Sequence, residues 1–289
     1  LTSGTFMINS AGTCVCGGTQ YVDADLIVGA GTYDLGGNSI GAGNLTVATG
    51  ATLDGDSGTI TCSGDFTTSG GLLGASCLDL DGSEQVAIPD DNSLDFTTAF
   101  TIEAWIKKGS ESGDRQIVTK GGGYYWLNLT GDIPKARFYD GTNRDVVATT
   151  NVADSKWHHI ACTYDQTTFK IYVDGKLEGT NAQTGTVSTS ATVFTIGSAG
   201  GSAYFNGQMD EVRVWSVART EALLRTDMFQ GGTLSNSTGL QGRWSCDEGT
   251  GTSLADSSSN TNTGVLTDAT AWAGAGTFTY GTSTLTMTG

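Results

Sequence analysis

Two alternating segments bring aromatic, amide and guanidinium groups together, and these are the groups that a sugar site uses. Residues 124–129 and 135–139 alternate as neighbouring strands do, with successive side chains on opposite faces. One side should face a core through Leu127, Leu129, Ala136 and Phe138. The other side presents five candidate ligand-binding residues, Tyr124, Trp126, Asn128, Arg137 and Tyr139. They could stack on a sugar ring and bond its hydroxyls; the competing interpretation is that a neighbouring subunit or repeat covers this face.

The acidic residues do not have the spacing expected for glycoside hydrolysis. That reaction needs two carboxylates across the scissile bond, about 5–5.5 Å apart for retention and about 6.5–9.5 Å for inversion. Asp210 and Glu211 are adjacent, so a regular strand points them to opposite faces, and Glu103 is alone on its strand. His158 and His159 have no Ser or Cys nucleophile motif beside them, so one should pack and the other should hydrogen-bond. We therefore predict a protein that is not an enzyme and has no catalytic residues.

The composition indicates that strands position these residues. Of the 289 residues, 43 are Gly and only 2 are Pro, while Thr is about as frequent as Gly. Thr, Val and the aromatic residues favour strands, and the Gly-rich pairs between them favour turns. A hydrophobic content of 37% argues against disorder. The sequence therefore predicts an all-β fold.

The charge of the chain excludes several classes of partner. Lys and Arg number 14 against 30 Asp and Glu, which gives a net charge of −16. Such a chain repels nucleic acid and anionic membrane surfaces. No apolar run approaches the roughly 18 residues of a membrane span. We expect no nucleic-acid partner, no membrane insertion, and a location that is extracellular, on a cell surface or on a virion surface.

A short Gly-Thr phrase recurs outside the central part of the chain. It occurs as Ser3-Gly4-Thr5-Phe6, Ala30-Gly31-Thr32-Tyr33 and Ser57-Gly58-Thr59-Ile60, at equally spaced starts, and returns at 275–278. Chance similarity is one explanation, because the phrase is short. The other is a β-solenoid-like repeat unit in which Phe6, Tyr33 and Ile60 occupy equivalent places. We expect the strand-like run 277–287 to pair with this N-terminal unit or with another chain's copy, which makes the central part an insertion.

The central part has the pattern of consecutive strands with one helix. Strand patterns cover residues 100–106, 125–129, 135–139, 159–164, 169–173, 193–197 and 209–215. Asp174-Gly175 is a hairpin signal, and only residues 219–229 have helical spacing. We therefore predict a Gly/Thr-rich β-repeat unit at 1–74, a sandwich or jelly roll at 75–273 and a further repeat strand at 274–289.

Several longer motifs give the central part a resemblance to a known family. They are 78–83 (LDLDGS), 100–105 (FTIEAW), 157–165 (WHHIACTYD), 171–175 (IYVDG), 205–215 (FNGQMDEVRVW) and 244–251 (WSCDEGTG). On these motifs, residues 76–272 resemble the laminin-G-like branch of the concanavalin A-like lectin/glucanase fold. The resemblance implies a jelly roll with structural aromatic residues at Trp105, Trp157, Trp215 and Trp244. It does not fix a function, because the family includes sugar binders, adhesion modules and inert spacers.

The resemblance also implies a structural calcium ion. In glucanase and lectin relatives, an Asp matching Asp210 often helps to hold calcium with backbone oxygens near the first strand, where Asp81 is a candidate contributor. Calcium takes about 6–8 oxygen ligands, which turn carbonyls and one or two carboxylates can supply. The alternative is that Asp210 caps a turn or bonds a nearby amide. Retaining glucanase relatives also carry Glu-x-Asp-x-x-Glu on a strand, a spacing that this chain lacks.

Two hypotheses of different classes follow. The first is a non-catalytic, calcium-stabilised, lectin-like recognition or adhesion module that binds a carbohydrate or glycoconjugate. The second is a structural subunit of a surface fibre, filament or virion appendage, in which the jelly roll decorates a shaft of β-repeats and the chain self-associates. Both suit an acidic, Gly/Thr-rich chain on an extracellular or particle surface.

Overall fold

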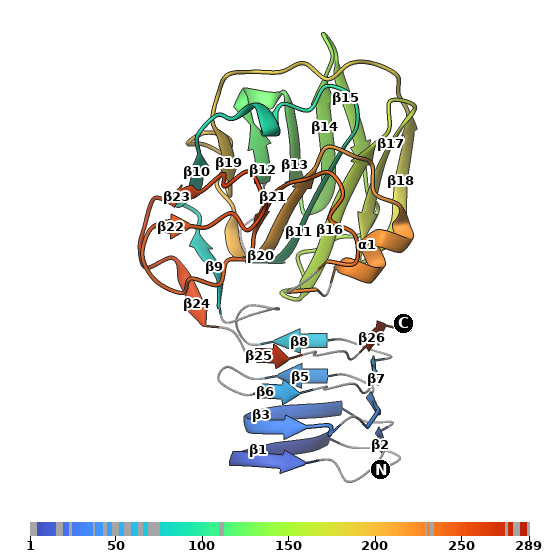
Figure 1. Cartoon of the computed structure of the whole chain (residues 1–289), viewed down its shortest axis with the longest axis vertical. Helices are drawn as coiled ribbons and strands as arrows, with labels where there is room; N and C mark the ends of the chain where they lie inside the picture. Colours follow the sequence, from blue (N-terminus) through green and yellow to red (C-terminus); the bar gives the residue numbers. More distant parts are fainter. Residues whose placement is uncertain are drawn as a thin grey trace. The chain divides into compact units, whose positions relative to one another are not determined.

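The computed structural model divides the chain into two compact units (Figure 1). We call residues 1–77 with 273–289 the parallel unit and residues 78–272 the sandwich unit, and describe each by itself. The structure describes residues 5–15, 20–22, 25–36, 38–42, 45–47, 52–54, 59–62, 66–68, 76–109, 113–228, 230–231, 234–274, 277–279 and 284–287.

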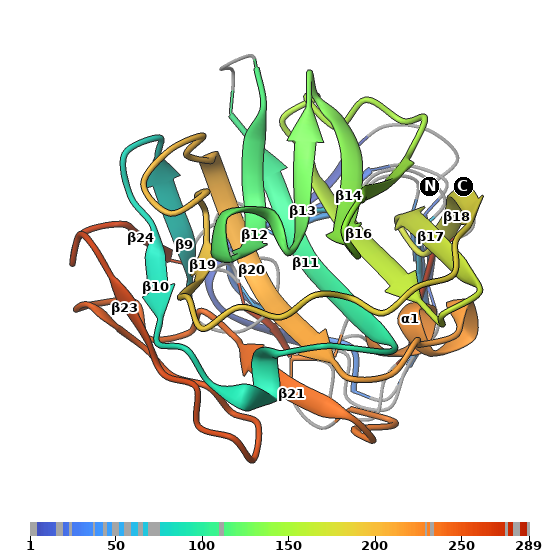
Figure 2. The same ribbon diagram turned by 90° about the horizontal axis from the view of Figure 1, so that it is seen from above.

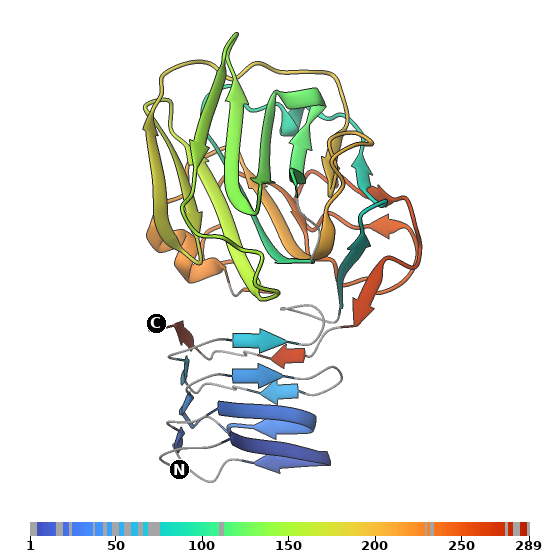
Figure 3. The same cartoon turned by 180° about the vertical axis from the view of Figure 1, so that it is seen from behind.

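Two antiparallel sheets form the sandwich, and Figures 2 and 3 show them from above and from behind. The first sheet has the order β15 (Asn143–Val147), β14 (Ile133–Tyr139), β13 (Tyr125–Thr130), β12 (Arg115–Lys120), β19 (Phe194–Ile196), β10 (Val86–Ile88), β23 (Gly264–Leu266) and β22 (Ser253–Leu254). The second has the order β18 (Lys176–Ala182), β17 (Thr168–Val173), β16 (Trp157–Tyr164), β11 (Phe100–Lys108), β20 (Asn206–Trp215), β9 (Ser76–Asp81) and β24 (Trp272–Gly274), with β21 (Leu240–Trp244) beside β20. The predicted all-β jelly-roll sandwich is confirmed.

Apolar side chains fill the space between the two sheets. The predicted core residues Leu127, Leu129, Ala136 and Phe138 are all fully buried there. Phe138 belongs to an aromatic cluster whose ring centroids lie 4.2–6.3 Å apart, completed by Phe100, Tyr164 and Phe169. Rings of this size bury a large apolar area in a close-packed interior, and so hold the two sheets in one arrangement. The four tryptophans expected to be structural are no more than 5% exposed.

One α-helix, α1 (Glu221–Asp227), covers part of the outer face of the second sheet. Thr220 caps it, because its hydroxyl oxygen accepts a hydrogen bond from the Leu223 amide at 3.3 Å. Leu224 is fully buried against Ala161 and Tyr172 of β16 and β17. The helix lies inside the predicted range of 219–229, and two short 3-10 turns occupy Asn92–Leu94 and Gly121–Gly123. In the part of the chain that the structure describes, no helix has the length and apolar character needed to cross a membrane.

The parallel unit contains two sheets, and every strand pair in its described residues is parallel. One sheet holds β1 (Thr5–Val15), β3 (Asp25–Asp34), β5 (Leu45–Val47), β6 (Thr52–Asp54), β8 (Phe66–Thr68) and β25 (Thr277–Thr279), and the other holds β2 (Gln20–Val22), β4 (Ile40–Ala42), β7 (Thr59–Cys62) and β26 (Thr284–Met287). The registers stack strand segments into three columns. The first column contains 5–8, 25–28, 45–47 and 66–68; the second contains 13–15, 32–34, 52–54 and 277–279; the third contains 20–22, 40–42, 59–62 and 284–287. We call three consecutive segments, one from each column, a coil.

The spacing of the coils corrects the period expected from the sequence. Partners in adjacent coils, such as Leu26 with Leu45, are closer in the chain than successive copies of the Gly-Thr phrase are. Phe6, Tyr33 and Ile60 were expected at equivalent places, but they fall in the first, second and third columns respectively. One coil holds three strand segments, one in each column. Successive copies of the phrase are separated by about one coil plus one further segment, so each copy lies one column further on.

The C-terminal segment pairs with the N-terminal strands, as predicted for residues 277–287. β25 lies beside β6 with Phe278 opposite Leu53, and β26 lies beside β7 with Leu285 opposite Ile60. These two strands complete a coil that β8 begins. The sandwich is therefore inserted, in sequence, between the first and second segments of one coil.

Candidate functional site

Strand register brings part of the predicted ligand-binding set together on the outer face of the first sheet. Thr195, Thr119, Trp126, Arg137 and Asp145 lie opposite one another on five neighbouring strands, from β19 to β15. Paired residues share a face, so these five side chains form one row, which we call the outer row. Within it, the Arg137 guanidinium lies over the Trp126 ring, 4.9 Å from its centroid.

A carboxylate that the sequence analysis did not identify fixes Arg137 in this position. Arg137 Nε and Nη2 donate to the two oxygens of Asp145 at 2.5 and 2.8 Å, and Lys135 Nζ lies 2.8 Å from the same carboxylate. Partial burial by itself favours a higher pKa for Asp145, but the bonds from Arg137 and Lys135 outweigh it and hold that pKa below its ordinary value. The bond to Asp145 likewise raises the pKa of Arg137. The pair therefore remains ionised and planar at neutral pH.

The geometry changes the role expected for Trp126. Trp126 is only 8% exposed. Lys135 Nζ also lies over its ring, 5.7 Å from the ring centroid. An open stacking platform was expected at this position. The ring instead supports the cations of the next strand, so the polar edge of Arg137 and Asp145 is what the row presents to solvent.

Two further residues of the predicted ligand-binding set, Tyr124 and Tyr139, lie side by side. Their rings meet edge to face with centroids 6.4 Å apart, and the Tyr139 amide donates to the Tyr124 carbonyl at 2.8 Å. Tyr139 is 38% exposed, which makes it the most accessible aromatic ring of the predicted set. It is the residue best placed to stack on a sugar.

Asn128 occupies the next row of the same face, opposite Gln116 on one side and Lys135 on the other. It is only 3% exposed, and its Oδ1 atom has no hydrogen-bond partner among the residues that the structure describes. Leaving a buried amide oxygen unpaired costs about 1–3 kcal/mol. Because Asn128 is almost fully buried, a ligand could bond this amide only after the side chain turns outward. Gln116 itself accepts a bond from the Thr119 hydroxyl at 3.1 Å.

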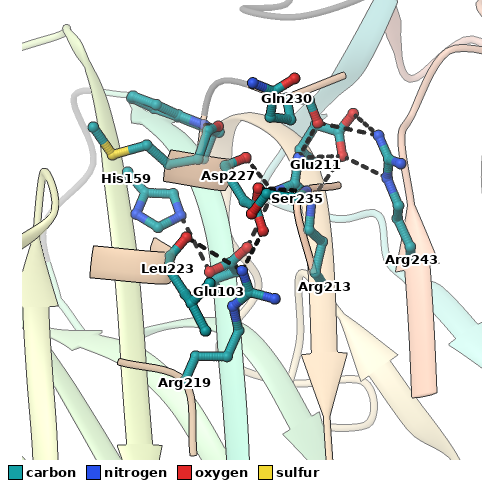
Figure 4. Close-up of polar contacts among 12 residues, drawn as sticks. Glu103, His159, Glu211, Arg213, Arg219, Leu223, Asp227, Gln230, Ser235 and Arg243 are labelled. Carbon is teal, nitrogen blue, oxygen red and sulfur yellow. Dashed lines mark hydrogen bonds and ion pairs between the residues drawn. The ribbon is translucent and has the colours of Figure 1, made fainter. Parts of the chain in front are cut away.

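A second charged cluster lies on the outer face of the second sheet and is fully enclosed (Figure 4). Arg213 is central: its guanidinium contacts Glu103 Oε1 at 3.1 Å and Glu211 Oε2 at 2.9 Å. Arg213 also donates to the backbone carbonyls of Asp227 and Gln230 at 2.8 and 2.5 Å. The cluster, which we call the buried network, is completed by His159, Arg219, Asp227 and Arg243. It thereby ties α1 and the segment after it to the sheet.

A β-bulge assembles the buried network and corrects the expected faces of Asp210 and Glu211. Glu103 is opposite Arg213, but Trp105 is opposite Asp210, so β20 carries one extra residue there. Glu211 is that residue and has a φ of 47°. Its carboxylate reaches Arg213 and Arg243 on the same face as Glu103, so Glu103 is not alone.

Burial controls the ionisation of this network. Burial raises the pKa of Glu103 despite the nearby arginines, whereas Arg213 and Arg243 outweigh burial at Glu211 and lower its pKa. Burial, together with the charges of Arg213 and Arg219, lowers the pKa of His159 to about 3, so its imidazole is neutral at neutral pH. His158 behaves differently: it bonds Asp174 at 2.8 Å and Asp154 at 3.0 Å. One histidine packs and the other hydrogen-bonds, as expected.

Asp81 and Asp210 do not meet in a shared metal site. Asp81 is opposite Asn206, and Asp210 lies four residues further along β20, a separation of about 13 Å along the strand. Asp81 Oδ1 already accepts bonds from the Ser83 amide and hydroxyl at 3.0 and 2.8 Å. Across the described ranges, no group of three or more acidic, His or Cys side chains is arranged to hold a metal ion. The two residues therefore do not fit one calcium ion between them.

Comparison with known proteins identifies the class. Residues 80–224 match the model of the concanavalin A-like lectin/glucanases superfamily, and the chain belongs to that family. No curated protein matches. The resemblance noted from the motifs is confirmed for the sandwich.

Several solved structures are similar to this chain at low sequence identity. A candidate carbohydrate-binding protein from Bacteroides ovatus is 24% identical, with a TM-score of 0.56 over 70% of this chain, which spans only 60% of that protein. Domain 4 of an extracellular arabinanase from Geobacillus stearothermophilus, solved with arabinotriose, has 19% identity and a TM-score of 0.47, covering 56% of this chain and 80% of the domain. Domains LG4-5 of mouse laminin α1 have 17% identity and a TM-score of 0.42, covering 53% and 44%. The likeness to the Bacteroides ovatus protein, at 24% identity, establishes the fold alone.

Proposed function

We propose that the sandwich is a non-catalytic module that binds carbohydrate through the outer face of its first sheet. The observation that carries the proposal is the ionised, partly exposed Arg137–Asp145 pair on the same face as the exposed ring of Tyr139. Few ligands offer several hydroxyls that both donate and accept within a short distance. A sugar does, and family membership is consistent with such a ligand.

Each group has a distinct part in this proposal. Asn128 lies in the next row of the same face, where its amide would hydrogen-bond a hydroxyl after its side chain turns toward the ligand. Asp145 accepts from a second hydroxyl and Arg137 donates to its oxygen, because the planar pair stays charged. Tyr139 supplies the exposed ring for stacking. Catalysis is not part of the proposal, because Glu103 and Glu211 are enclosed and bound to arginines.

The test is a glycan array screened with the wild type, Arg137→Gln and Arg144→Gln. Arg144 is the matched control: it is an arginine of the same hairpin that pairs with Asp140 at 3.0 Å, and it lies outside the outer row. We expect array signals that Arg137→Gln removes and Arg144→Gln keeps. A wild type without any signal would favour the packing interpretation of this face. Release of reducing ends from a bound glycan would contradict the non-catalytic assignment.

Surface display and calcium remain part of the proposal. The acidity of the chain supports an extracellular or particle surface. Because Asp81 and Asp210 cannot share an ion, any calcium would use one of them with backbone oxygens. Melts with calcium and then with chelator test this, and Asp81→Asn and Asp210→Asn identify the residue that carries the shift. An unchanged melting temperature in all samples would remove calcium from the proposal.

A second candidate function is that of a structural subunit in a surface fibre, filament or virion appendage. The observation that favours it is the insertion of the whole sandwich within one coil of a parallel stack. A domain inserted in this way leaves the parallel pairing of the coil intact, because β25 and β26 still continue the columns of β6 and β7. In a fibre, such a domain would decorate a shaft built of coils. The two functions are compatible, because the shaft and the outer row belong to different units.

A further inference from the structure

Lys120 is fully buried on the core side of the first sheet, in a place where a lysine is uncommon. Lysine is almost never fully buried unless it is paired. Lys120 ends β12 and lies opposite Tyr125 of β13 on one side and Phe194 of β19 on the other. Paired residues share a face, and both aromatic side chains belong to the core between the sheets. The side chain of Lys120 is therefore held in largely apolar surroundings.

Two carboxylates meet the Lys120 amine. Both come from the loop between β10 and β11, which carries the chain from the first sheet to the second. Lys120 Nζ lies 2.5 Å from Asp90 Oδ1 and 3.5 Å from Asp95 Oδ1. Asp95 Oδ1 is buried, and no hydrogen bond reaches it from the residues that the structure describes. The Tyr125 hydroxyl donates to the Leu94 carbonyl at 2.7 Å, which holds this loop against the sheet.

The three side chains have the separate roles that amide formation needs. A lysine held in a desolvated pocket acts as a nucleophile. The Asp90 side chain is 33% exposed, so an oxygen that leaves its carboxyl group has a route to solvent. Asp95, with its unbonded oxygen, is placed to take a proton from the amine and return it. Reacting groups held in contact reach effective concentrations of about 10⁵–10⁸ M, which accelerates a reaction that is slow between free partners.

We propose that Lys120 and Asp90 form an intramolecular amide, an isopeptide bond, in the folded chain, with Asp95 as the proton carrier. A bond forms between Lys120 Nζ and Asp90 Cγ, and one C–O bond of Asp90 breaks. Two of the three ammonium protons leave with that oxygen, one of them by way of Asp95. The ion pair thereby becomes a neutral amide and one water molecule, with no oxidant, reductant or other reagent.

This bond would fasten the end of β12 to the loop that links the two sheets. It would replace an ion pair, which acid or salt can weaken, with a covalent crosslink across the sandwich. The inference does not rest on carbohydrate binding, because none of the three residues belongs to the outer row. The two proposals can therefore fail separately.

The intact mass of the denatured full chain tests the proposal. We expect the folded wild type, kept at neutral pH and then denatured, to weigh one water molecule less than its sequence. Lys120→Arg keeps the charge but loses the nucleophilic amine, and Asp95→Asn keeps both reacting groups but loses the proton carrier; both should have the full sequence mass. Lys108→Met is the matched control, because Lys108 is also buried and lies 2.9 Å from Asp132 Oδ1. This control should lose one water molecule as the wild type does.

A trypsin digest of the wild type locates the bond and does not depend on how any variant folds. Trypsin does not cleave after an acylated lysine, so Lys120 should remain uncleaved. No Lys or Arg precedes Lys107, and Arg115 and Lys135 are the neighbouring cleavage sites of Lys120. The expected product is therefore a branched peptide that joins residues 1–107 to residues 116–135.

The place of the water loss decides the outcome. Cyclisation at Asp-Gly pairs such as Asp81-Gly82 also releases water, but mild alkali restores that water and leaves an amide intact. A wild type of full sequence mass overturns the proposal, and so does a loss that alkali reverses or that Lys108→Met removes. A branched peptide that forms equally fast in Asp95→Asn would overturn the role of Asp95.

Discussion

The two outer faces of the sandwich carry the same combination of side chains in different surroundings, one partly exposed and the other buried. On each face an arginine lies over a tryptophan and pairs with a carboxylate: Arg137 with Trp126 and Asp145, and Arg219 with Trp215 and Asp227. The side chain of Arg137 is 25% exposed, whereas those of Arg213 and Arg219 are 1% and 2% exposed. Cover by α1 and the segment after it accounts for this difference, since their carbonyls accept bonds from Arg213.

The comparison shows that residue types alone do not identify a binding site. The enclosed ion pairs are shielded from solvent, and Arg213 bonds the backbone carbonyls that hold the helix and the segment after it. The partly exposed Arg137–Asp145 pair, in contrast, has bonding capacity left for a ligand. Substitutions that act on one face should therefore change stability, and those on the other should change binding.

The largest expected effect is from Arg213→Met. Removing this cation leaves Glu103 and Glu211 buried without their shared partner, which costs about 3–5 kcal/mol of unfolding free energy. All six tryptophans lie in residues 78–272, so urea unfolding followed by their fluorescence reports on the sandwich. A loss below about 1 kcal/mol would mean that the network is solvated and would remove the contrast between the two faces.

Acid should weaken the enclosed face through His159. Its pKa is about 3 in the folded chain against 6.5 ordinarily, so below pH 6.5 the unfolded state binds the proton first. Stability from neutral His159 is present above pH 6.5 and is lost as pH falls toward 3. The loss by pH 5 is about 2 kcal/mol, from the ordinary pKa and roughly 1.4 kcal/mol per pH unit. His159→Gln should flatten this dependence in urea unfolding at pH 7 and pH 5; an equally steep variant would assign the dependence to other groups.

On the open face, Arg137→Met should change stability little. A partly exposed ion pair contributes about 0.2–1 kcal/mol, far less than the loss expected for Arg213→Met. Urea unfolding of the two variants side by side measures the difference between the faces. A loss at Arg137 as large as that at Arg213 would indicate that the outer row is structural and would weaken the carbohydrate proposal.

Alternation predicted part of the candidate site and tertiary pairing determined the rest. The alternation of 124–129 and 135–139 correctly placed Arg137 on the same face as Trp126. It also correctly placed Leu127, Leu129, Ala136 and Phe138 in the core. It could not find Asp145, because β15 has no apolar alternation and becomes a strand only through pairing with β14. The predicted face of Glu211 was wrong because a β-bulge at this residue, with a φ of 47°, turns its side chain to the other face. The bulge depends on the pairing of β20 with β11, which the sequence of β20 alone does not specify.

The parallel unit gives a similar lesson about repeats. The expected period of the Gly-Thr phrase was wrong, but a signal for the second column was present in the sequence. Ala11-Gly12-Thr13, Ala30-Gly31-Thr32 and Ala275-Gly276-Thr277 all end at the Thr of that column. The first two are separated by the same interval as the coil partners Leu26 and Leu45. The insertion of the sandwich separates the third from the others and hides the period.

The smallest expected effect is at His158, and it has the opposite sign from that at His159. Burial alone would lower the His158 pKa, but bonds and charge from Asp174 and then Asp154 outweigh it and raise that pKa. Its stabilisation is therefore fully present below pH 6.5 and is lost as pH rises through the raised folded value. We expect His158→Gln to cost roughly half a kcal/mol at pH 6 and less at pH 9. Urea unfolding of variant and wild type at both pH values measures this, because subtracting the two removes the contribution of His159. A cost that grows toward pH 9 would show that the imidazole is neutral, and that the two histidines differ in exposure but not in charge.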